Sequence, residues 1–175
     1  FPDTDGRYAM SIRMPHPLDL ADELSELPQR VEVVAPSSSE YIGRVAVRRA
    51  ALALLPQEDI EFSTAKAMRP RAAGPMWKIV SSDGVTIALR ARDLPDVHQV
   101  RPDIAKLTRR RDELRSVIVE DAETARVSFW ILRGRHVVIV GARLLPERRS
   151  ATVERDARRV LGVLAGIHPE RALEY

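Results

Sequence analysis

The chain has 175 residues, of which 45% are hydrophobic and 30% charged, and its formal net charge is +3 at pH 7. This composition is typical of a globular protein of one or two domains and excludes a largely disordered chain. The sequence contains no cysteine, which excludes disulfides, thiolate metal sites and a cysteine nucleophile. No apolar run approaches the roughly 18 residues of a membrane span.

The acidic first part of the chain has the pattern of a β-α-β-α-β unit. Polar and apolar residues alternate over 7–14, which predicts a strand, and leucines recur at helical spacing over 18–27. An apolar run at 31–35 predicts a second strand. A helix is predicted from about 37 to 55, before a proline, and a further strand at 59–64.

The basic second part has the pattern β-β-α-β-β-β-α. Strands predicted at 76–81 and 85–91 flank an Asp-Gly turn, which is typical of a β-hairpin. The remaining predicted elements are a helix from 102 to about 115, an antiparallel three-strand meander at 116–120, 125–132 and 136–144, and a C-terminal helix at 150–165. Hairpins mixed with β-α units indicate an α+β fold.

Charge is distributed unevenly about an irregular segment between these two parts. Residues 1–68 hold 7 basic and 11 acidic residues, whereas residues 69–175 hold 21 basic and 14 acidic residues. Two prolines and a glycine in 69–75 interrupt regular structure. We therefore predict an acidic subregion at 1–68, a linker at 69–75 and a basic subregion at 76–175, with little hydrophobic core shared between the subregions.

Motifs of several enzyme classes are absent from the sequence. None of the eight glycines belongs to a G-x-G-x-x-G or P-loop motif, and no G-x-S-x-G nucleophile elbow occurs. The four histidines lack the spacing of a helical metal site, so we expect no metal and no cofactor. These absences favour a non-enzymatic binding or assembly module over an enzyme.

Arginine supplies 25 of the 28 basic residues and is clustered in the basic subregion. Arg155, Arg158 and Arg159 have the spacing of one exposed helix face. The apolar stripe that we expect to be buried opposite them comprises Val153, Val160, Leu161 and Leu164. Such clusters contact phosphate backbones without reading sequence. The residues predicted to contact RNA or an acidic protein partner are Arg109, Arg110, Arg111, Arg133, Arg135, Arg148, Arg155, Arg158 and Arg159.

A candidate anion site lies where the helix predicted at 37–55 begins. Ser37, Ser38 and Ser39 place hydroxyls and backbone amides at a helix N-terminus, and Arg44 follows one turn later. The same region has a purely structural interpretation, because the S-x-x-E spacing that begins at Ser37 is that of a capping box. Both interpretations predict a serine-capped helix start.

Two further hypotheses compete with the binding module. One is a small enzyme or ligand-binding domain whose pocket lies near residues 92–101 and the serine helix start. The other is a structural domain that forms homo-oligomers through sheet edges of the meander. Single-strand recognition by stacking has little support, because Phe129 and Trp130 lie on alternate faces of one strand and at most one should be exposed. We expect a cytoplasmic protein or, alternatively, one of an organelle matrix that has lost a targeting segment.

Overall fold

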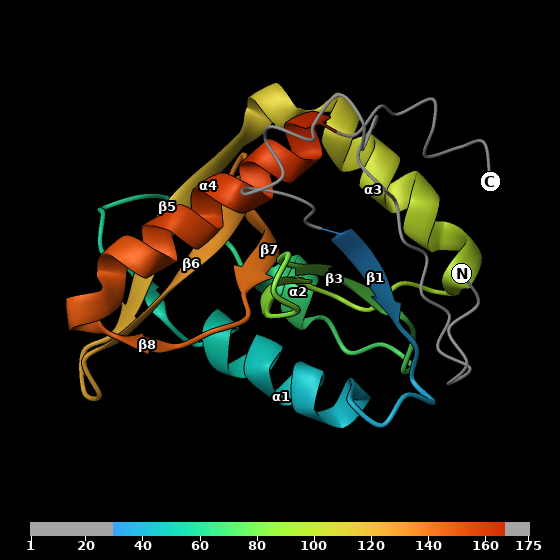
Figure 1. Cartoon of the computed structure of the whole chain (residues 1–175), viewed down its shortest axis with the longest axis horizontal. Coiled ribbons are helices and arrows are strands. Elements are labelled where there is room, and N and C mark those ends of the chain that lie inside the picture. The colour runs from blue at the N-terminus through green and yellow to red at the C-terminus, as the bar shows by residue number, and fades with distance from the viewer. Residues whose placement is uncertain (1–29, 167–175) are drawn as a thin grey trace.

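A computed structural model describes residues 30–166 as an α+β structure built on one sheet (Figure 1). The strands are β1 (Arg30–Val34), β2 (Leu55–Pro56), β3 (Met76–Val80), β4 (Thr86–Arg90), β5 (Leu114–Asp121), β6 (Arg126–Arg133), β7 (His136–Gly141) and β8 (Leu145–Pro146). The helices are α1 (Tyr41–Leu52), α2 (Ala65–Met68), α3 (Val100–Arg109) and α4 (Ser150–Gly166). Three 3-10 turns, η1 (Val97–Gln99), η2 (Arg111–Glu113) and η3 (Glu147–Arg149), precede α3, β5 and α4.

The sheet has eight strands in the order β1-β3-β4-β7-β6-β5-β2, and β8 pairs with the beginning of β6. Neighbouring strands are antiparallel throughout. This architecture confirms the predicted α+β class. The strand predicted at 7–14 and the helix predicted at 18–27 lie outside the described residues.

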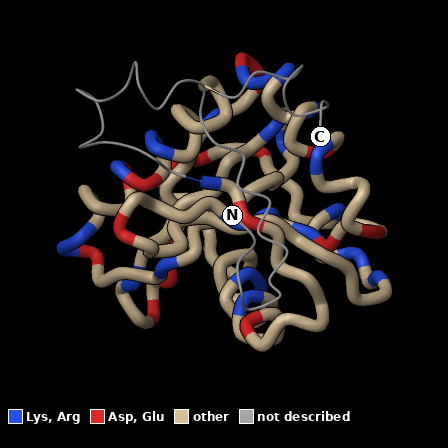
Figure 2. Tube along the Cα trace, turned by 45° about the vertical axis from the view of Figure 1, so that its right-hand side comes forward, with Lys and Arg blue, Asp and Glu red and all other residues tan. Residues whose placement is uncertain are grey.

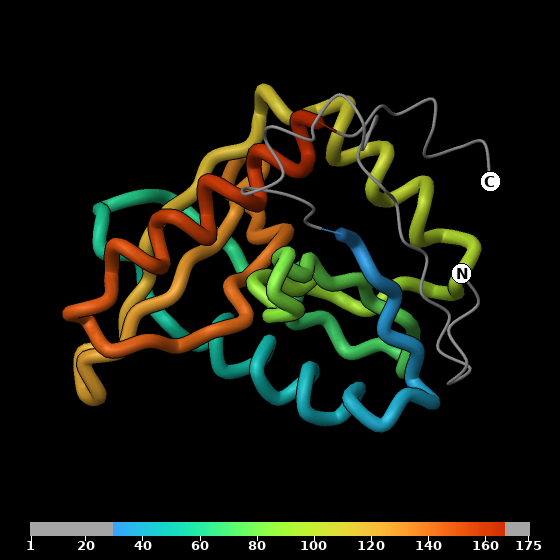
Figure 3. The backbone as a smooth tube through the Cα atoms, in the orientation of Figure 1, coloured from blue at the N-terminus to red at the C-terminus, as the bar shows by residue number. Residues whose placement is uncertain are grey.

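Helices cover both faces of the sheet (Figure 3). α3 and α4 pack on one face and α1 on the other, so the protein has two hydrophobic cores. Side chains of the central strands alternate between these cores, as the two-residue period of a strand requires. In β6, Phe129 faces the core of α3 and α4, whereas Trp130 faces the core of α1. Both aromatic side chains are buried, so neither is available to stack on a base.

The two sequence subregions share this sheet and its cores. β1 pairs with β3 in a register that places Val33 opposite Trp77, and β2 pairs with β5. Val31 lies in the same core as Trp77. The expectation that residues 1–68 and 76–175 share little hydrophobic core is therefore wrong. Charge differs between the subregions, but the apolar residues of β1 are buried only when it joins the sheet of the basic subregion.

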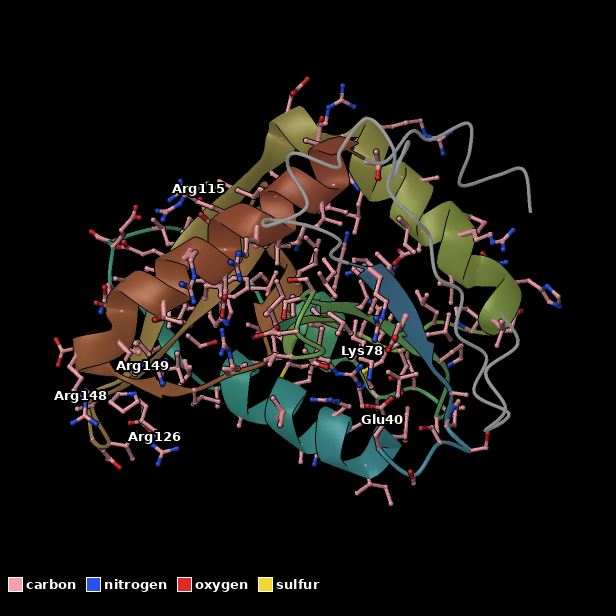
Figure 4. All side chains as sticks on the ribbon, in the orientation of Figure 1. Glu40, Lys78, Arg115, Arg126, Arg148 and Arg149 are labelled. Carbon is pink, nitrogen blue, oxygen red and sulfur yellow. The ribbon has the colours of Figure 1, made fainter. Side chains whose placement is uncertain are left out.

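The helix predicted over 37–55 is present but shorter, and its N-terminus differs from the predicted capping box. α1 begins at Tyr41, and the residues after it form the edge strand β2, a position where proline is tolerated. The side chain of Glu40, the N-cap residue of α1, makes no capping hydrogen bond, so the predicted capping box is wrong, but Ser38 Oγ accepts from the backbone N–H of Glu40 at 3.4 Å. Its carboxylate instead binds Lys78 of β3 and Arg44 of α1 (Figure 4). Both carboxylate oxygens of Glu40 are thus bound by cations.

Other elements match their predicted positions within a few residues, with two exceptions. Residues 59–64 form no strand, and Ser63 makes only an isolated parallel bridge to His136. α3 ends before Arg115, which lies in β5. The β3–β4 hairpin has Gly84 at a φ of 83°, the positive value that its Asp-Gly turn requires. Within residues 30–166, no helix is long and apolar enough to cross a membrane.

Candidate functional site

A cleft of about 600 Å³ opens at one end of the central strands, between α3, α2 and the β6–β7 hairpin. Antiparallel pairing brings the end of β4 and the start of β7 together at this end of the sheet. The charged side chains that line the cleft are Lys66, Arg90, Arg92, Asp103, Lys106, Arg110, Glu113 and Arg133. Six of these eight side chains are cationic. The cleft therefore concentrates positive potential between low-dielectric walls.

A buried ion pair fixes α3 to the sheet at this cleft. Arg90 of β4 donates to Asp103 of α3 through Nε, at 2.7 Å from Oδ2, and through Nη2, at 3.1 Å from Oδ1. Trp77 Nε1 donates to the same carboxylate at 2.8 Å. Burial alone would raise the pKa of Asp103, but the charge and hydrogen bonds of Arg90 hold that pKa below its usual value. Arg90 is thus neutralised by a carboxylate.

Arg92, which follows β4, has no comparable partner. Its Nε is out of contact with solvent and makes no hydrogen bond with the described residues. Burial, and then the nearby charge of Arg90, lowers the pKa of Arg92 below its usual value, although Asp103 opposes that shift. A desolvated donor without an acceptor is destabilising. The buried Nε is out of reach of a ligand, but the charge of an anion in the cleft would offset the repulsion between Arg92 and Arg90.

His136, at the start of β7, also lines the cleft. Its Nδ1 is buried and makes no hydrogen bond with residues 30–166. Burial, and then the charges of Lys66, Arg135 and Arg133, lowers the pKa of His136. The imidazole is therefore neutral at pH 7. A bound anion would favour the protonated form and raise this pKa.

The arginines predicted to contact a partner fall into two separate groups. In the first group, Arg110 and Arg133 line the cleft, and Arg109, Arg111 and Arg135 are exposed residues close to them in the sequence. Glu113 connects the end of α3 with the β6–β7 hairpin, because Glu113 Oε2 lies 3.4 Å from Nε of Arg133 and 3.9 Å from Nη1 of Arg110. Basic and acidic positions are interspersed along the described trace (Figure 2). The positive cleft therefore arises from the convergence of several elements and not from one basic run.

The second group lies on α4 and at its start, outside the cleft lining. Arg155 and Arg158 are exposed and Arg159 is half-buried, so all three lie at least partly in solvent. The stripe opposite them, Val153, Val160, Leu161 and Leu164, is buried except for the half-buried Leu161. The two predicted faces of α4 are thus confirmed. Arg148 lies with Arg126 and Arg149 at the N-terminal end of α4 (Figure 4).

The predicted serine site already contains an internal anion. Arg44 donates to Glu40 Oε2 at 3.1 Å through Nε and to Thr86 Oγ1 at 3.0 Å through Nη2. Burial raises the pKa of Glu40, but hydrogen bonds from Lys78 and Arg44 bring it below its usual value, so the carboxylate is charged at neutral pH. Anion binding by the candidate residues Ser37, Ser38, Ser39 and Arg44 stays a prediction, in competition with this carboxylate.

The central residues of the cleft were not among the sites predicted from sequence. Lys66, Arg90, Arg92 and Lys106 are single basic residues in unremarkable local patterns. The sequence signal that pointed to the cleft was the irregular segment at 92–101, near which a pocket was predicted. Arg92 is the first residue of that segment. Three tertiary contacts bring these residues together: β4 pairs with β7, Ser63 before α2 bridges to His136, and Arg90 binds Asp103 of α3.

Comparisons with protein-family models, with curated proteins and with solved structures find no match for this chain. Across residues 30–166, no group of three or more histidine, aspartate and glutamate side chains could hold a metal ion. The fold and the site together describe an α+β protein with a cationic cleft.

Proposed function

We propose that this protein is a binding module for a phosphate-bearing ligand, whose anionic group occupies the cleft beside Arg92. The observation that supports this function is the convergence of six cationic side chains in one cleft, among them Arg92, which burial and the charge of Arg90 destabilise. Phosphate oxygens accept strong, charge-assisted hydrogen bonds from arginine. The cleft volume of about 600 Å³ lies within the range of about 300–1,000 Å³ for small-ligand sites.

The cleft has cations on opposite walls. Lys106 and Arg110 are four residues apart, so they project from neighbouring turns at the end of α3. Lys66 comes from α2 and Arg133 from the β6–β7 hairpin. A phosphate between these walls would contact side chains from several elements, and Arg90 would act as a positioning residue because Asp103 already neutralises it.

The backbone of RNA, predicted from the arginine clusters, is the second candidate ligand. The exposed arginines Arg109 and Arg111 favour it, because they extend positive charge beyond the cleft, as does Arg135, which pairs with the exposed Glu61 at 3.1 Å. Trp77, Phe129 and Trp130 are buried, so RNA would be held through its phosphates and not by stacking on these rings. An acidic protein surface, the other predicted partner, would contact the same exposed arginines.

Isothermal titration calorimetry with pyrophosphate tests the principal proposal. Arg92→Gln should weaken pyrophosphate binding at least about tenfold, because a charge-assisted hydrogen bond contributes about 1.5–3 kcal/mol. Arg158→Gln is the matched control, since Arg158 is exposed on α4 and does not line the cleft. Circular dichroism melting of both variants checks that they are folded. Equal weakening in the two variants, or no binding of pyrophosphate at low salt, would contradict the proposal.

A second titration distinguishes RNA from a small ligand. A single-stranded RNA of about one dozen nucleotides is added to the protein with and without saturating pyrophosphate. Competition between the two ligands would place the RNA backbone in the cleft. RNA binding that resists pyrophosphate but disappears on changing Arg109, Arg111 and Arg135 to glutamine would assign the function to the exposed rim instead.

A further inference from the structure

A second hollow, of about 390 Å³, adjoins the cleft and shares Ala67 and Arg92 with it. It lies on the α1 side of the sheet, between α1, α2 and the segment 69–73. Its lining differs from that of the cleft because it includes the apolar side chains of Ile42, Val45, Leu52, Ala67, Met68 and Ala73. Two of these are large hydrophobic residues in contact with water, since Ile42 is 81% and Met68 52% exposed.

A polar cluster at this hollow fixes the chain segment that carries Arg92. Arg48 Nη1 lies 2.9 Å from Asp93 Oδ1, and the Tyr41 hydroxyl donates to Asp93 Oδ2. Burial, and then the Asp93 charge, raises the pKa of Tyr41, so the phenol stays protonated and remains a donor. The Asp93 charge is therefore compensated by Arg48, although its buried Oδ1 accepts no hydrogen bond from residues 30–166. Its neighbour Arg92 is the cation at the junction of the two hollows that lacks a hydrogen-bonded acceptor on Nε.

We infer that the two hollows form one site for an anionic amphiphile, with a phosphate head beside Arg92 and an alkyl chain over Ile42, Val45 and Met68. This inference rests on the proposed phosphate-binding function and specifies the ligand class. Exposed apolar side chains gathered beside a polar rim mark a binding surface. The cations Arg49, Arg69 and Arg71, which also line the second hollow, complement the negative charge of such a ligand.

The occupant is a single amphiphile in solution and not a membrane surface. Only two large apolar side chains of the hollow's lining are exposed, Ile42 and Met68, whereas docking on a bilayer requires the apolar face of an amphipathic element to be buried in the lipid. An inorganic phosphate or a nucleotide would fill the cleft and leave the apolar hollow in contact with water. An alkyl phosphate satisfies both hollows at once.

Calorimetry with n-octyl phosphate, below its micellar concentration, and with ethyl phosphate tests the inference. The octyl ester should bind at least about tenfold more tightly, because part of its chain is removed from water. The double variant Ile42→Ser and Met68→Ser should lose this advantage and bind ethyl phosphate unchanged. Val97→Ser is the control, since Val97 is 38% exposed and lines neither hollow. It should bind both esters as the parent does.

The possible failures are distinguishable. Equal affinity for the two esters, with both dependent on Arg92, would overturn the inference and leave the proposed phosphate binding intact. Failure of both esters and of pyrophosphate to bind would overturn the two together. Binding to vesicles that contain phosphatidic acid, without binding of soluble octyl phosphate, would assign a membrane surface and would also overturn the inference. Disappearance of the octyl advantage in Val97→Ser would show that the apolar hollow is not its source.

Discussion

The cleft and the outer face of α4 are both rich in arginine, but their charges are in different environments. At the cleft, Arg90 is fixed by a buried carboxylate and Arg92 has a desolvated Nε without an acceptor. On α4, Arg155 and Arg158 are exposed to water. A hydrated arginine gains little net free energy when an anion replaces its water, whereas a desolvated arginine gains more in a lower dielectric. Desolvation is therefore a better guide to a binding site than the number of arginines.

The largest expected effect comes from the buried pair that supports the cleft. Asp103→Asn leaves the Arg90 charge without a counterion, so we expect the free energy of unfolding at pH 7 to fall by about 3 kcal/mol in urea titrations. Asp112→Asn, in the exposed turn after α3, is the control and should change it by less than about 0.5 kcal/mol. A decrease below about 1 kcal/mol for Asp103→Asn would show that the pair resembles an exposed one.

The same pair predicts how stability depends on pH. The folded-state pKa of Asp103 is below its ordinary value of 3.8, so its stabilising contribution is present above pH 3.8. The contribution disappears as the pH falls through the folded-state pKa. Urea titrations between pH 7 and pH 2 should therefore show the difference between the parent and Asp103→Asn shrinking at the acid end. A constant difference in the free energy of unfolding over this range would contradict the lowered pKa of Asp103.

The next effect tests whether α4 or the cleft rim holds RNA. If α4 contacts the RNA backbone, changing Arg155, Arg158 and Arg159 together to alanine should weaken RNA binding and lower the slope of log K against log salt by about 0.7 to 0.9 for each phosphate that the variant no longer neutralises. The affinity for pyrophosphate should stay the same, because none of the three lines the cleft. Fluorescence anisotropy at several salt concentrations measures the slope. An unchanged slope would remove α4 from the RNA hypothesis.

A smaller effect is expected from His136 in the cleft. Because its pKa is lowered in the free protein and a bound anion favours the charged imidazole, anion affinity should rise as the pH falls from 7 to 5.5. The rise should be at most about tenfold, which corresponds to a shift of one pKa unit. Sulfate is a suitable probe because its own charge is constant over this range. His136→Gln should remove the pH dependence, and its persistence in that variant would exclude His136 as the cause.

The smallest effect is expected at an exposed ion pair. Arg115 Nη2 lies 3.2 Å from Glu58 Oε2, with the two side chains 52% and 59% exposed (Figure 4). Arg115→Gln should change the free energy of unfolding by less than about 0.5 kcal/mol in urea titrations. A change as large as that of Asp103→Asn would mean that burial does not determine how much an ion pair contributes to the free energy of unfolding.

The elements whose formation depends on local pattern could be predicted from the sequence. The β3–β4 hairpin follows from its Asp-Gly turn, and the amphipathic α4 follows from the spacing of its apolar residues. The strands of the meander were located within a few residues for the same reason. In each case, the period of a strand or helix is visible within one short stretch of chain.

Only the tertiary structure decided which segments meet. Strand pairing across a long separation depends on which partner buries the apolar face, so nothing local to β1 indicates that it joins β3. Glu40 has the spacing of a capping residue, but a lysine 38 residues away in the sequence determines its actual partner. The cleft likewise depends on contacts between segments that are distant in the sequence. Arg92 acquires its importance from the burial of its Nε and the nearby charge of Arg90, and burial is a property of the packed chain and not of the residue type.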